Sequence, residues 1–187
     1  MIHIQSLTLF TILNLYFKFI FNRKPTTMKS IKVELKWAII FTIMSMLWIM
    51  LEKLTGLHDE NIEQHPIYTN MYAIPAIIIF ILALKDKKKN FFQGHASYKH
   101  LFISGLILSL MIALLAPLST YVSVEFITPE YFDNAIKMSV EQNMMEQIEA
   151  EEYFNTSNYM FQNLMFAPIM GIVTTLVVSI FLRSKSK

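Results

Sequence analysis

The sequence contains no cysteine and only four glycines among its 187 residues. The absence of cysteine excludes disulfide scaffolds, iron–sulfur clusters, thiol nucleophiles and cysteine-ligated zinc. The glycines lie too far apart for a dinucleotide fingerprint or a phosphate-binding loop, which need glycines within one turn. The HExxH and GxSxG motifs are also missing. We therefore expect a protein that is not an enzyme, with no catalytic residues and no cofactor.

Charge is scarce as well. Only 16% of the residues are charged and 54% are hydrophobic, whereas an ordinary soluble domain has about 25% charged residues. This composition excludes a disordered chain and most soluble folds. The formal net charge of +2 gives no reason to expect nucleic-acid binding. The composition indicates an integral membrane protein.

Long uncharged runs predict the membrane spans. A bilayer core about 30 Å thick needs about 20 apolar residues of helix. The run Trp37–Leu51 is shorter, but it reaches that length if Lys36 snorkels to one interface and Glu52 lies near the other; otherwise it is a buried core helix. Three runs are long enough by themselves: Pro66–Leu84, Leu101–Val124 and Tyr153–Leu182. The predicted spans cover about residues 33–54, 67–84, 101–121 and 159–182.

The fold class that follows is all-α: an antiparallel four-helix transmembrane bundle, because backbone polar groups in lipid must be satisfied within helices. Eleven of the thirteen Lys and Arg residues after residue 27 lie before the first span, between spans two and three, or after span four. Basic residues in short loops stay on the cytoplasmic side. We therefore expect a bacterial inner-membrane protein with both ends of residues 28–187 in the cytoplasm.

Residues 1–27 form a separate segment. The apolar run Leu7–Phe21 is interrupted by Lys18 and has neither a basic start nor a cleavage site, so a signal peptide is not expected. From Met28 the sequence is typical of a short basic segment that precedes a membrane span. We expect residues 1–27 to be a non-native or extra hydrophobic extension and residues 28–187 to be the four-span domain; a fifth span is the alternative.

Small residues at helical spacing predict the faces on which the spans pack, since helices in lipid associate through close contacts of small side chains. The predicted packing residues are Ala38, Thr42 and Ser45 in span one, Gly105, Ser109 and Ala113 in span three, and Ala167, Gly171, Thr175 and Ser179 in span four.

Glu52 lies near the small-residue face of span one, inside the membrane boundary. Burying a carboxylate there costs free energy, so such a residue is a candidate for a functional role. It forms a candidate polar cluster with His58, His65 and Asn70, and Asn70 or Thr69 is its expected partner. Two imidazoles near carboxylates could bind a divalent cation or sense pH. The spacing matches no known ligand motif, so we expect no metal ion and interpret the hairpin as a solvated acidic turn.

The loop between spans three and four predicts an amphipathic extracytoplasmic helix or helix pair. Thr128, Pro129 and Glu130 are typical of a helix start, with a capping hydroxyl, proline at the first position and an acid at the positive dipole end. The apolar stripe that follows is Phe132, Ile136, Val140, Met144 and Ile148. Such a helix rests on the membrane surface or caps the bundle. A further alternative is that it binds a partner through its methionine side.

On the opposite side, the loop Lys85–Lys99 combines lysines with aromatic residues. Beside two spans this pattern favours contact with anionic lipid headgroups over nucleic acid.

Several segments carry a family resemblance: LKWAIIFTIMSMLWIMLEKLTGLH, HPIYTNMYAIPAIIIFILALKDKK and SGLILSLMIALLAPLSTYV. From about Met28 to its end the chain resembles the bacterial membrane proteins grouped as domain of unknown function family 4199. The resemblance implies a four-span membrane protein without an assigned activity, and it transfers no catalytic residue.

We expect a non-enzymatic structural or accessory protein that binds the bilayer and a second copy or another membrane protein. The first alternative is a small transporter or ion-coupled channel that uses Glu52 and helices kinked at Pro75, Pro117 and Pro168. The weakest alternative is a membrane enzyme that uses His58, His65 and the nearby acidic residues.

Overall fold

The computed structural model describes residues 31–184, and all regular secondary structure in that range is helical. Four helical segments are long and apolar enough to cross a membrane: Lys32–Leu54, Ile62–Asn90, Tyr98–Ile127 and Thr156–Leu182. The all-α class is confirmed, and these four apolar helices contain the four spans expected from the sequence. The expected extension at residues 1–27 lies outside the described residues.

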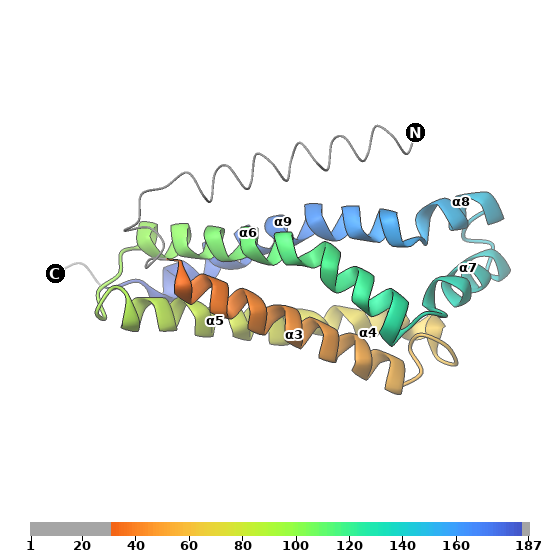
Figure 1. The fold of residues 1–187 in the computed structure, drawn as a ribbon, viewed down its shortest axis with the longest axis horizontal. Helices are drawn as coiled ribbons and strands as arrows, with labels where there is room; N and C mark the ends of the chain where they lie inside the picture. Colours follow the sequence, from red (N-terminus) through yellow and green to blue (C-terminus); the bar gives the residue numbers. More distant parts are fainter. Residues whose placement is uncertain (1–30, 185–187) are drawn as a thin grey trace.

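The long helices lie side by side, and successive ones run in opposite directions, with two short helices at one end (Figure 1). The first two long helices are α3 (Lys32–Leu54) and α5 (Ala73–Asn90), with η1 (Ile62–Gln64), α4 (His65–Tyr68) and η2 (Thr69–Tyr72) between them. The chain continues through α6 (Tyr98–Val122), the π-helical turn η3 (Ser123–Ile127), α7 (Tyr131–Glu141), α8 (Gln147–Tyr153) and α9 (Thr156–Leu182).

Helix α6 makes the most extensive contacts in the bundle, first with α9 and then with α3. A Cβ atom added to Gly105 would overlap Thr175, and one added to Gly171 would overlap Ser109. Because glycine has no side chain, the backbones of α6 and α9 approach each other closely at these two positions. The remaining predicted packing residues of these helices, Ala113, Ala167 and Ser179, are buried or packed against the buried core.

Helix α3 packs through its small residues too. Ala38 is fully buried in a core cluster with residues of α5 and α6. Thr42 donates a hydrogen bond to the Ala38 carbonyl, and Ser45 Oγ lies 2.6 Å from the Tyr72 hydroxyl. This polar contact joins α3 to the segment that leads into α5.

The second span does not begin as the expected continuous helix. The short helix α4 begins at His65 with Pro66 in its first turn, and the 3-10 segment η2 separates it from α5. Pro75 has no N–H and its ring would clash with the Met71 carbonyl in an α-helix, so α-helical pairing is interrupted before Ala73. Pro75 thus lies in the first turn of α5, while Pro117 and Pro168 lie inside α6 and α9.

The loop between the last two spans contains two short helices, α7 and α8. The expected capping role of Thr128 is wrong, because the N-cap of α7 is Glu130 and makes no side-chain capping bond. The expected continuation of the apolar stripe is wrong as well. Asn143 has a left-handed backbone conformation (φ 54°), and the chain changes direction there after the end of α7. Met144 and Ile148 therefore do not continue the apolar face of α7, and both are exposed.

Candidate functional site

A glycine turn at the end of α3 brings two polar residues together. Gly56 has φ +75°, its N–H donates to the Lys53 carbonyl, and the Leu57 N–H donates to the Glu52 carbonyl. This pattern is a Schellman motif, which reverses the chain after a helix. The reversal brings His58 next to Glu52, so the backbone turn at Gly56 positions the two side chains of the site.

Glu52 is the buried centre of the candidate site, with only 4% of its surface exposed. Its Oε1 accepts a hydrogen bond of 2.6 Å from Trp48 Nε1, one helical turn earlier. Its Oε2 lies 3.4 Å from His58 Nε2 and 3.8 Å from His65 Nε2. The Thr69 side chain also interacts with the carboxylate. One carboxylate oxygen therefore faces two imidazoles while the other is occupied by the indole.

Residues from beyond α6 hold His58 in place. His58 Nδ1 shares a buried hydrogen bond of 3.0 Å with Thr128 Oγ1, and Asn134 of α7 donates to the His58 carbonyl. The Tyr131 ring lies 4.7 Å from the His58 ring and 5.3 Å from the His65 ring, measured between centroids. Burial raises the pKa of the Tyr131 hydroxyl, so this group stays protonated around neutral pH. Helix α7 thus covers the histidines.

Three of the four residues in the predicted polar cluster come together here. Asn70 does not, because it is exposed and its side chain donates to the Pro66 carbonyl in the preceding turn. The expected pairing of Glu52 with Asn70 is therefore corrected, and the interaction with Thr69 is observed.

Three further residues contact the cluster and were not predicted to do so from the sequence: Trp48, Thr128 and Tyr131. Trp48 could have been found from its spacing, since residues four apart on a helix share a face. Thr128 and Tyr131 carry no such signal, because only the tertiary fold brings them to the histidines.

The ligand atoms of Glu52, His58 and His65 all lie within 4.8 Å of one another, which is close enough to hold a metal ion.

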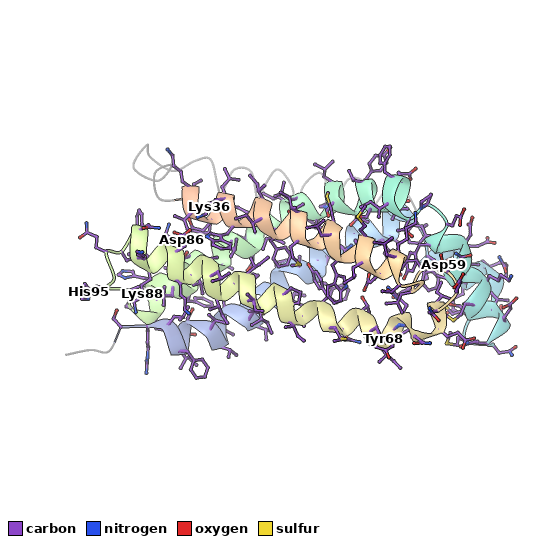
Figure 2. The ribbon with its side chains drawn as sticks, turned by 90° about the horizontal axis from the view of Figure 1, so that it is seen from below. Lys36, Asp59, Tyr68, Asp86, Lys88 and His95 are labelled. Atoms are coloured by element: carbon purple, nitrogen blue, oxygen red, sulfur yellow. The ribbon has the colours of Figure 1, made fainter. Side chains whose placement is uncertain are left out.

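The opposite end of the bundle is basic, and both acidic residues described there are paired. Lys87 Nζ lies 2.9 Å from the carboxylate oxygens of Glu34, and Ser104 donates to the same carboxylate. Asp86 forms a salt bridge with Lys36 (Figure 2). The remaining lysines of this end therefore dominate its surface charge.

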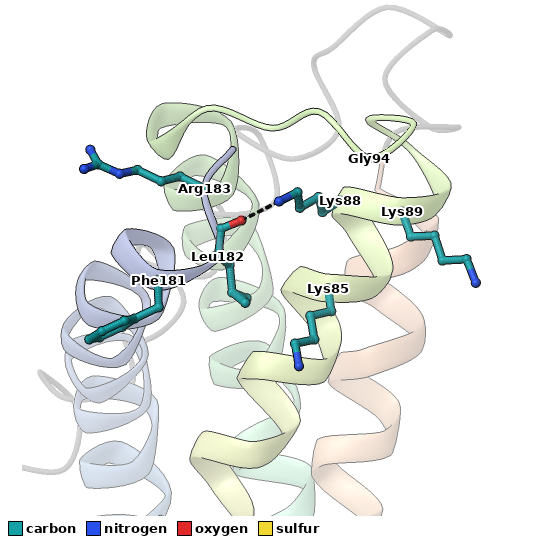
Figure 3. A pocket seen from close by; sticks show the side chains of 7 residues that line it. All are labelled: Lys85, Lys88, Lys89, Gly94, Phe181, Leu182 and Arg183. Carbon is teal, nitrogen blue, oxygen red and sulfur yellow. Dashed lines mark hydrogen bonds between the residues drawn. The ribbon is translucent and has the colours of Figure 1, made fainter. Parts of the chain in front are cut away.

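A shallow pocket of about 360 Å³ opens at the basic end, between the end of α5 and the end of α9. Lys88 donates a hydrogen bond of 2.8 Å to the Leu182 carbonyl, and Lys85, Lys89 and Arg183 also line the pocket, with the side chains of Lys89 and Arg183 directed outward (Figure 3). Phe181, which also lines the pocket, is 80% exposed. The pocket combines cationic side chains with an apolar rim.

Comparison with known proteins identifies the family. The family described as "Protein of unknown function (DUF4199)" matches residues 36–184, and the chain belongs to this family. No curated protein and no solved structure matches the chain. The resemblance expected from the sequence is confirmed.

Proposed function

We propose that the chain is a non-enzymatic structural or accessory protein of the bacterial inner membrane, with both ends of residues 28–187 in the cytoplasm. The observation that supports this is the division of its surface into three zones. The sides of the four long helices expose apolar residues such as Leu47 and Ile180, one end is basic and the other end is acidic. An apolar belt between two charged ends fits a bilayer.

The basic end faces the cytoplasm in this proposal. The start of α3, the loop between α5 and α6, and the end of α9 lie at that end (Figure 1). Lysine-rich ends of spans remain on the cytoplasmic side, where anionic lipids also concentrate. The helices α7 and α8 then lie outside the cytoplasm, over the acidic end.

The pocket between α5 and α9 is the proposed contact with anionic lipid headgroups. Its lysines and arginine attract a phosphate group, and the exposed Phe181 side chain, which lines the same pocket, offers an apolar surface to the acyl chains. Each basic residue close to an anionic surface contributes about 1 kcal/mol to the attraction. Contact at several such residues would hold the basic end at the membrane surface.

Reconstitution into vesicles tests this contact. In phosphatidylglycerol-containing vesicles we expect the protein to unfold at a higher temperature than in vesicles of phosphatidylcholine alone. The reason is that the anionic headgroups bind the pocket of the folded protein, which the unfolded chain lacks, and so stabilise the folded state. The double variant Lys85→Glu/Lys89→Glu is expected to lose this difference, whereas Lys137→Glu, on α7 at the acidic end, is expected to keep it. An equal difference in the wild type and the double variant would remove the headgroup contact from the proposal.

An accessory role also requires a partner, which is a second copy or another membrane protein. After extraction in a mild detergent, the purified protein is expected to run as a stable complex larger than one chain. A monodisperse monomer with no associated protein would count against the accessory role.

A second candidate function is ion-coupled transport, which the burial of Glu52 in an apolar helix favours. In proteoliposomes such a protein would show an ion flux that the Glu52→Gln variant lowers. Flux that the substitution does not change, across several ions, would eliminate this function.

A further inference from the structure

We propose that Glu52, His58 and His65 form a binding site for a first-row transition-metal dication, with Zn²⁺ as the ion that fits best. The site lies where α3 ends and the chain turns toward α4, under the cover of α7. It is independent of the headgroup contact at the opposite end, so either proposal can fail while the other stands.

The distances fit the ion. Zn²⁺ held tetrahedrally at about 2.0–2.1 Å from each ligand keeps its ligand atoms about 3.3 Å apart. The Glu52 Oε2 atom lies 3.4 Å and 3.8 Å from the two imidazole Nε2 atoms, and all three groups lie within 4.8 Å of one another. A small inward movement of His65 would complete the arrangement.

Neighbouring side chains orient the ligand atoms as metal sites require. A metal-binding histidine usually donates its other ring N–H to a second group, which fixes the tautomer. With the proton on His58 Nδ1, the hydrogen bond to Thr128 leaves the Nε2 lone pair facing Glu52. Trp48 occupies Oε1 of Glu52 in the same way, which leaves Oε2 for the ion.

The negative charge of the buried Glu52 carboxylate favours a cation between Glu52, His58 and His65. A buried carboxylate is costly unless it is paired, and within residues 31–184 no lysine or arginine forms a salt bridge with Glu52. Exposed Asp59, Glu60 and Glu63 lie in the turn between Glu52 and His65 and raise the local concentration of cations.

The ligand chemistry selects the class of ion. Two imidazoles with one carboxylate suit zinc, copper, nickel or iron, whereas magnesium and calcium prefer oxygen ligands alone. Three protein ligands leave a fourth position, which a water molecule fills in zinc sites of this kind.

Metal binding to the purified full-length protein tests the proposal. After treatment with a chelator, the protein in detergent micelles is titrated with Zn²⁺ alone, and the metal retained after desalting is measured. We expect one ion per chain in the wild type, little or none in His65→Ala and Glu52→Gln, and an unchanged value in the matched control His95→Ala. His95 is exposed and lies at the basic end.

The positioning role of Thr128 gives a graded result. Thr128→Val keeps all three ligands and removes the hydrogen bond to His58, so Zn²⁺ affinity is expected to fall about 10–100-fold. Titration of the wild type with Co²⁺ needs no variant and reports ligation directly through the visible absorption of four-coordinate cobalt. A wild type that retains no Zn²⁺ and gives no such Co²⁺ spectrum would overturn the proposal, as would Zn²⁺ retention in His65→Ala equal to that of the wild type.

Discussion

Single buried charges distinguish the two ends of this protein. Glu34 and Lys87 are each 2% exposed and neutralise one another at the basic end, with Ser104 as a further donor to the carboxylate. Glu52 at the acidic end has imidazoles and an indole as its polar neighbours. At the residue scale, the buried carboxylate of Glu34 is paired with a lysine, whereas that of Glu52 lies beside two histidines at distances that could accommodate a metal ion.

The buried pair predicts an asymmetric response to substitution. Lys87→Met removes the ammonium group and leaves the Glu34 carboxylate buried without it, so we expect a loss of about 3–5 kcal/mol in the free energy of unfolding. Denaturation of the protein in detergent micelles measures this change.

Two variants control for general effects of the substitution. Glu34→Gln/Lys87→Met removes both charges and is expected to recover most of the lost stability. Lys89→Met alters an exposed lysine two residues away and is expected to change the free energy of unfolding by less than about 0.5 kcal/mol. If Lys87→Met and Lys89→Met behaved alike, the buried pair would have no special role.

The sequence predicted that Glu52, His58 and His65 belong to one polar cluster, but helical spacing accounts only for the burial of Glu52. Helical spacing from Ala38 placed Glu52 on the packing face of span one, and Glu52 is buried. The meeting of His58 and His65 with Glu52 depends on the backbone of Gly56 and on contacts with α7. Neither the left-handed turn nor the long-range contact produces a periodic pattern in the sequence.

At the scale of elements, the contact between α6 and α9 depends on the absence of side chains. Gly105 faces Thr175 and Gly171 faces Ser109, so each glycine accepts a hydroxyl-bearing residue of the other helix. Close packing of this kind replaces the hydrophobic effect, which does not act between helices in lipid.

Gly105→Ala is predicted to separate the two helices locally. The added Cβ would overlap Thr175, and overpacking of this kind costs about 1–3 kcal/mol. The thermal unfolding temperature in micelles is therefore expected to fall. Combining it with Thr175→Ala removes the atoms that clash most closely and should restore part of the loss; no recovery in the double variant would place the strain elsewhere.

Hydropathy and length predicted the long elements because a span must exceed a minimum apolar length. Their ends were less predictable. The irregular start of the second span follows from Pro75, and the break between α7 and α8 follows from the backbone at Asn143. A local conformation changed the direction of the chain there, although the apolar spacing from Val140 to Ile148 continued without interruption.

At the scale of the whole molecule, charge separates along the bundle. The described part of the chain carries the acidic turn after α3 and the helices α7 and α8 at one end, and the lysines of α5 at the other (Figures 1 and 2). Because the long helices alternate in direction, the positive-inside rule predicts one orientation for the described bundle, with its basic end in the cytoplasm.

Cysteine labelling in intact cells tests that orientation most directly, since the sequence has no cysteine of its own. Single cysteines replace exposed residues at the two ends, Glu60→Cys beside the acidic turn and His95→Cys between α5 and α6. With a membrane-impermeant maleimide we expect Glu60→Cys to react in intact cells and His95→Cys to react only after the membrane is permeabilised. Labelling of His95→Cys in intact cells, with Glu60→Cys protected, would contradict the proposed topology.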